Sequence, residues 1–275
     1  MRIDAHQHFW MYNSIRDAWI NDDMQVLRQN FLPEDLRPLL QKNNMDGCVA
    51  VQADQSIDET NFLLQLADEN DFIKAVVGWV NLRANDVEMQ LEKFSHNKKL
   101  KGFRHIVQAE TQEDFLLRND FCKGISFLKK FDFTYDILVY PKQLKTVIEF
   151  VKRFPDQPFV IDHLAKPNIK KGKNEEWEKD IQTIAQFPNV YCKLSGMVTE
   201  ADWKHWTVAD FKPYIDIVLE SFGTKRVMFG SDWPVCLLSA SYQQCCEVLE
   251  QNTSYLNDEE RRNLWGKNAE RFYNI

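Results

Sequence analysis

The sequence predicts a single (β/α)8 barrel domain that spans residues 1–275. Short apolar segments with the pattern of buried strands recur along the chain, and amphipathic segments with helical spacing separate them. Strict alternation of strand and helix produces a parallel sheet, and eight such units close the sheet into a barrel. The length of 275 residues and the apolar content of 44% suit one barrel with a large core.

Eight apolar segments account for the predicted strands. In chain order they span residues 2–8, 46–53, 74–82, 100–107, 133–139, 158–163, 189–195 and 226–232. The segments between them have the spacing of surface helices: apolar residues follow Pro141 at steps of three and four, and Pro33 suits the first turn of a helix. An open doubly wound sheet is the alternative, but no glycine-rich phosphate loop follows the first strand. The closed barrel is therefore the better prediction.

The composition points to a small-molecule partner. The formal net charge is −7 and the pI is near 5.5, which argues against a nucleic-acid or anionic-membrane surface. Six cysteines show no paired spacing, as is typical of buried free thiols in a reducing compartment. The chain opens directly into a strand and has no apolar stretch of the roughly 20 residues that span a bilayer. We therefore expect a cytoplasmic protein. The sequence leaves open whether it forms a homo-oligomer.

The predicted strands end on polar residues. In a barrel of parallel strands the carboxyl ends form one rim, where active sites lie. The polar residues expected there are His6, His8, Gln52, Trp79, Asn81, Arg104, His105, Asp136, Asp162, His163, Lys193, Ser195 and Asp232. Placing such groups at buried strand ends costs desolvation unless they pair or bind a ligand, so a functional site is the better interpretation. A buried ion-pair network that only supports the barrel is the alternative.

Four of these residues suit a metal or a hydrolytic reaction. His6 and His8 are two apart in a strand, so their imidazoles lie on one face. With His163 and the carboxylate of Asp232 they would form a set of nitrogen and oxygen donors for one divalent cation, zinc or manganese, which would acidify bound water. The same residues could act without metal, with Asp232 as general base and Arg104 and the histidines stabilising the oxyanion.

Cationic residues of the rim indicate how a substrate would bind. Arg104, His105 and Lys193 offer many hydrogen-bond donors and no carboxylate. They suit a ligand rich in hydroxyl and carbonyl oxygens and a product that gains a carboxylate. The basic segment 170–173 is expected to be a solvated loop tip.

Five motifs resemble those of the amidohydrolase superfamily, and more narrowly its branch of sugar lactonases of the L-fuconolactonase and L-rhamnonolactonase type. They are Asp4-Ala-His6-Gln-His8-Phe-Trp10, Gly102-Phe-Arg104-His105, Ile161-Asp-His163-Leu-Ala-Lys166-Pro167, Cys192-Lys193-Leu-Ser195-Gly196 and Gly230-Ser-Asp232-Trp-Pro-Val235. The resemblance covers nearly the whole chain. It implies a distorted (β/α)8 barrel, hydrolysis of a sugar-acid lactone in carbohydrate catabolism, and a shared active-site set of His6, His8, His163 and Asp232. Asp232 and His163 are the catalytic residues that it predicts.

The chain departs from the wider superfamily where binuclear members carry a bridging lysine or glutamate. Arg104-His105 occupies that position, and His163 stands alone where others have two metal histidines. We therefore expect one divalent ion or none. A metal-dependent decarboxylase, a carbon-carbon lyase of the same superfamily, is the alternative function. Trp203, Trp206 and Trp233 are candidate platforms for a sugar face, and packing on neighbouring helices is the other interpretation.

Overall fold

A computed structural model describes residues 1–172 and 174–275. Its eight strands form one parallel sheet in sequential order. They are β1 (Ile3–Gln7), β2 (Gly47–Val51), β3 (Ile73–Gly78), β4 (Leu100–His105), β5 (Thr134–Ile137), β6 (Phe159–Ile161), β7 (Val190–Leu194) and β8 (Val227–Phe229). The sheet closes where β1 meets the segment after β8, because His8 N donates to the Trp233 carbonyl at 2.7 Å and Asp232 N to the His6 carbonyl at 2.8 Å. The predicted (β/α)8 barrel is confirmed.

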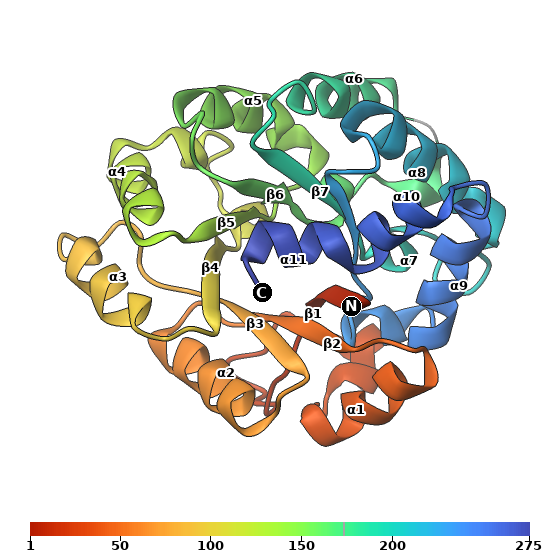
Figure 1. The fold of residues 1–275 in the computed structure, drawn as a ribbon, viewed down its shortest axis with the longest axis horizontal. Helices are drawn as coiled ribbons and strands as arrows, with labels where there is room; N and C mark the ends of the chain where they lie inside the picture. Colours follow the sequence, from red (N-terminus) through yellow and green to blue (C-terminus); the bar gives the residue numbers. More distant parts are fainter. Residues whose placement is uncertain (173) are drawn as a thin grey trace.

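The helices surround the barrel (Figure 1). They are α1 (Pro33–Lys42), α2 (Ile57–Glu69), α3 (Val87–Ser95), α4 (Asn119–Leu128), α5 (Leu144–Arg153), α6 (Glu175–Ile184), α7 (Met197–Glu200), α8 (Val208–Phe222), α9 (Tyr242–Asn252), α10 (Asp258–Arg262) and α11 (Asn268–Tyr273). In α5 the buried residues Leu144, Val147 and Phe150 recur every three residues, as the apolar spacing predicts. None of the helices in the described part of the chain is long and apolar enough to cross a membrane.

One end of the barrel is closed by the last helix. The interior there is filled by small and branched side chains, among them Ala5, Val49 and Val77, which pack against Phe272 and Tyr273 of α11. Figure 1 shows α11 lying across the barrel next to both chain ends. Because the amino end is closed in this way, the carboxyl ends of the strands are left to form the site.

Two further predictions concern the cysteines and the basic segment 170–173. All six cysteines are free, and only Cys122 is not buried. Lys170 and Lys171 of the basic segment are exposed, and the segment's last residue, Lys173, lies outside the described residues.

Candidate active site

An irregularity in β1 brings His6 and His8 to the same point. The register between β1 and β2 shifts between Asp4 and Gln7. Ala5 packs in the barrel interior, so simple alternation would direct Gln7 inward as well. Instead, Gln7 Nε2 contacts Cys48 Sγ at 3.4 Å on the outer side. The Nε2 atoms of His6 and His8 lie 3.2 Å apart in the interior, so the two imidazoles meet as predicted, but through this irregularity and not through strand alternation.

Asp4 holds this irregularity in place. Its carboxylate accepts hydrogen bonds from His6 N at 3.1 Å, Ser231 N at 2.9 Å, Ser231 Oγ at 2.6 Å and the Tyr242 hydroxyl at 3.0 Å. Burial raises the pKa of Asp4 to about 6, although the hydrogen bonds from Ser231 oppose the shift. Asp4 therefore ties the strand that carries His6 to the segment that carries Asp232. Sequence reasoning gave this residue no role.

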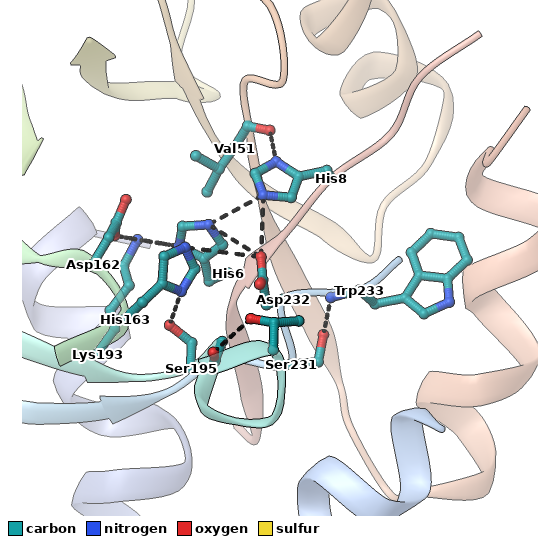
Figure 2. A network of polar contacts seen from close by, with 12 residues as sticks. His6, His8, Val51, Asp162, His163, Lys193, Ser195, Ser231, Asp232 and Trp233 are labelled. Carbon is teal, nitrogen blue, oxygen red and sulfur yellow. Dashed lines mark hydrogen bonds and ion pairs between the residues drawn. The ribbon is translucent and has the colours of Figure 1, made fainter. Parts of the chain in front are cut away.

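His6, His8 and Asp232 form a compact donor set (Figure 2). His8 Nδ1 lies 2.7 Å from the Val51 carbonyl oxygen, so Nδ1 carries the proton and Nε2 presents its lone pair. Asp232 Oδ1 lies 3.4 Å from His8 Nε2 and 3.9 Å from His6 Nε2. Ligand atoms around a tetrahedral zinc ion stand about 3.3 Å apart, given zinc–nitrogen distances of about 2.0 Å. The spacing of these donors suits one divalent cation.

The histidines of the site are neutral at neutral pH. Burial lowers the pKa of His6, His8 and His163, because the charged imidazolium loses its hydration. Burial by itself would raise the pKa of Asp232, but its interactions with His163 and His8 and the positive charge of Lys166 outweigh burial, and the pKa is lowered. The site thus combines an ionised carboxylate with imidazoles that can accept a proton or bind a metal.

A buried ion network lies beneath these residues. Lys193 Nζ contacts Asp136 Oδ2 at 2.5 Å, Asp162 Oδ1 at 3.0 Å and His6 Nδ1 at 3.2 Å. Arg104 contacts Asp162 Oδ2 at 3.1 Å and His6 Nε2 at 3.2 Å. Burial would raise the pKa of Asp162, but Lys193 and His6 outweigh it and hold the pKa well below its usual range. The network supplies a fixed cation directly below His6, so part of the polar rim is a buried ion network, and a functional site above it stays a prediction.

The site opens into a cavity of about 420 Å³. Its polar lining combines the imidazoles of His8 and His163 and the Asp232 carboxylate with two cationic side chains, Arg104 and Lys166. Aliphatic side chains and three aromatic rings line most of the rest. The lining residues are His8, Trp10, Trp19, Met24, Ala53, Arg104, Ile106, Gln108, Ala109, Leu138, Tyr140, His163, Lys166, Asp232 and Val235. A volume of this size accommodates a small polar molecule.

Of the predicted substrate-binding residues, Arg104 lines the cavity and three others lie elsewhere. His105, the neighbour of Arg104 in β4, points to the opposite side, where its Nε2 contacts Glu110 at 2.7 Å. Lys193 is fully buried in the ion network. Trp233 is 2% exposed and packs edge-on against neighbouring rings. Substrate contact by these three stays a prediction that the cavity lining does not support.

The tryptophans of the loop after β7 bond to the backbone of the protein. Trp203 Nε1 donates to the Thr199 carbonyl at 2.8 Å, and Trp206 Nε1 donates to the Ser239 carbonyl at 3.0 Å. Both are outside the described cavity lining. The packing interpretation therefore suits them better than the role of a sugar platform.

Sequence reasoning missed several cavity residues, among them Trp19, Tyr140 and Lys166. Trp19 and Tyr140 lie in loops after β1 and β5, where no periodic pattern signals a role. Lys166 had a usable signal, since it lies three residues after His163 in the motif that follows β6. Loops at this end of a barrel shape the ligand site, so these loop residues are candidates for ligand contact in the same way as residues at the strand ends.

Comparison with known proteins assigns the chain to a family. A family model described as amidohydrolase matches residues 3–275. The chain belongs to the amidohydrolase family. An L-fucono-1,5-lactonase of Burkholderia multivorans is 40% identical to this amidohydrolase and aligns with 99% of this chain and 96% of its own length. An L-fucono-1,5-lactonase of Burkholderia ambifaria is 34% identical, covering 100% of this chain and 96% of the relative.

Solved structures agree with the family assignment. A crystal structure of an amidohydrolase from Burkholderia multivorans with bound zinc has a TM-score of 0.97 to this amidohydrolase, at 40% identity, and covers 100% of this chain and 99% of that chain. A dihydroxybenzoic acid decarboxylase from Polaromonas with bound manganese has a TM-score of 0.70 at 11% identity, over 99% of this chain and 96% of its own. The second likeness shows the fold alone. It therefore does not support the decarboxylase alternative.

Proposed function

We propose that this amidohydrolase hydrolyses sugar-acid lactones of the L-fucono-1,5-lactone type. The observation that carries this proposal is the ionised Asp232 carboxylate on the cavity wall, flanked by neutral imidazoles and by Arg104. A lactone needs a base for the attacking water and donors for the oxygen that becomes charged. The two L-fucono-1,5-lactonases, matched over almost their whole length, support the choice of substrate class.

Asp232 is the proposed general base. His163 Nε2 lies 3.8 Å from Asp232 Oδ1, a gap too long for a direct hydrogen bond and suited to a water shared by the two groups. Asp232 takes one proton as the water oxygen bonds to the lactone carbonyl carbon, and Arg104 stabilises the oxyanion. The ring carbon–oxygen bond then breaks, and the ring oxygen leaves as an alkoxide that takes the proton back from Asp232. The product is a free sugar acid.

His163 is held for this role by its other nitrogen. Its Nδ1 lies 2.9 Å from Ser195 Oγ at the end of β7. That contact fixes the plane of the ring and keeps Nε2 directed at Asp232 (Figure 2). His163 is thus proposed to orient the attacking water while Asp232 takes the proton of that water.

A bound zinc or manganese ion would be held by His6, His8 and Asp232 and would acidify water and polarise the ester carbonyl. We expect protein purified without chelator to contain about one such ion per chain, and the double variant H6A/H8A to contain none. Elemental analysis measures both. The double variant H96A/H205A is the matched control, because these histidines are outside the donor set and should leave the metal content unchanged. Full activity in metal-free protein would contradict a required metal and favour Asp232 acting directly.

A substrate panel tests the proposed function. L-fucono-, L-rhamnono- and L-galactono-lactones are supplied, and acid release is followed with a pH indicator. Carbon dioxide release from aromatic and enol acids is measured in parallel. We expect lactone opening with a preference for one configuration. Carbon dioxide release without lactone opening would instead establish the decarboxylase.

The proposed reaction suits carbohydrate catabolism, where oxidation of an aldose at its anomeric carbon yields a lactone that must be opened. The six free cysteines support a reducing compartment, and we propose the cytoplasm as the place of action.

A further inference from the structure

Residues 163–166, directly after β6, form a left-handed turn. The φ angles of His163, Leu164, Ala165 and Lys166 are 53°, 53°, 58° and 52°, and none of the four is glycine. L-amino acids avoid this region, at a cost of roughly 1 kcal/mol or more per residue. Consecutive residues of this kind persist only where the surrounding structure holds them, and they concentrate at ligand sites.

The turn is held by a hydrogen bond across it, by a hydrogen bond from α6 and by the burial of its two middle residues. Lys166 N donates to the His163 carbonyl at 2.7 Å, and Trp177 Nε1 of α6 donates to the Leu164 carbonyl at 2.7 Å. Leu164 and Ala165 are fully buried. The consequence is that the first and last residues of the turn, His163 and Lys166, both line the cavity.

Lys166 differs from the other cations of the site in having no carboxylate partner. Arg104 is engaged by Asp162 and by the Gln52 carbonyl, and Lys193 by two aspartates. Among the described residues, no carboxylate oxygen lies within ion-pair distance of Lys166 Nζ, which stands 5.7 Å from the centre of the Tyr140 ring. The ammonium is partly buried and interacts with the Asp232 and Glu200 carboxylates only from beyond ion-pair distance. A cavity cation without a direct ion-pair partner suits an anionic ligand.

We infer that Lys166 is the carboxylate-binding residue of this cavity and that its ligand is a polyhydroxylated carboxylate, the sugar acid. The inference rests on the proposed function for the origin of that acid, because opening a neutral lactone creates the carboxylate inside the cavity. The Tyr140 ring keeps the ammonium near the mouth through cation–π attraction. Arg104 also lines the cavity and keeps its proposed role at the oxyanion of the reacting ester.

Binding of L-fuconate, measured by isothermal titration calorimetry, tests this inference. The neutral alditol L-fucitol serves as the comparison ligand, because it has the hydroxyl groups and lacks the carboxylate. Lys166→Met removes the charge and keeps the length of the side chain. We expect this variant to bind L-fuconate about tenfold to a hundredfold more weakly, as for the loss of a hydrogen bond between charged groups, and L-fucitol unchanged.

Lys142→Met is the matched control. Lys142 also follows β5 at this end of the barrel, but it is exposed and lies 3.7 Å from Glu113. The Lys142→Met variant should bind L-fuconate as the unmodified protein does. Lys166→Arg keeps the charge and should recover much of the affinity. Thermal melting of each variant checks that the barrel is folded.

The outcomes separate this inference from the proposed function. Unchanged L-fuconate affinity in folded Lys166→Met would overturn the inference while leaving lactone opening intact. L-fuconate binding no tighter than L-fucitol binding in the unmodified protein would overturn it as well. A protein that opens no lactone, yet loses L-fuconate affinity on Lys166→Met, would overturn the proposed function and support Lys166 as the carboxylate site.

Discussion

Asparagine in place of Asp232 is expected to lower lactone turnover by at least about a hundredfold and to leave the barrel folded. An amide cannot take the proton of the attacking water, although it has nearly the size of the carboxylate. Asp232 has a positive φ of 58°, a conformation that asparagine tolerates better than most residues. Initial rates measure the loss, and circular dichroism with thermal melting checks the fold.

Asp202→Asn is the control for that experiment. Asp202 is a carboxylate of the loop after α7 that pairs with Lys170 at 3.0 Å outside the cavity lining. Its amide variant should keep near-normal rates. Near-normal turnover in Asp232→Asn itself would remove Asp232 from the mechanism.

Methionine in place of Lys193 is expected to lower the free energy of unfolding by about 3–5 kcal/mol, the cost of removing one partner from a buried ion pair. Asp136 and Asp162, both fully buried, would lose the cation that they share. Methionine fills much of the same volume, so the charge rather than a cavity accounts for the loss. Urea denaturation followed by fluorescence measures the change.

Two variants sharpen the Lys193 experiment. Lys212→Met removes a lysine that pairs with Asp216 on the exposed face of α8 at 2.7 Å, and should leave the free energy of unfolding nearly unchanged. Asp136→Asn added to Lys193→Met should recover part of the stability, because one uncompensated carboxylate is then neutral. If Lys193→Met is as stable as the unmodified protein, the ion network contributes nothing to the fold.

Much of the fold was predictable from residue patterns. Each predicted strand overlaps a strand of the barrel, because a strand buried on both faces needs a nearly continuous apolar run. The ends were less accurate: the third strand was expected at 74–82 and ends at Gly78. Backbone pairing with the neighbouring strands sets such an end, and the pattern of one segment does not contain it.

The sequence by itself determined the barrel and the placement of Asp232 at a strand end, since these depend on local periodicity and on the parallel order of strands. The meeting of His6 and His8 inside the barrel depends in addition on the register shift in β1. Tertiary structure decided which polar residues face the cavity. Arg104 and His105 are neighbours in β4 and only one can point inward, a choice made by pairing register. Depth along the barrel put Lys193 below the site, and a left-handed turn held by α6 and β7 carried Lys166 into it. Contacts from elements distant in sequence set these positions. Among them only Lys166 had a local signal, its place three residues after His163.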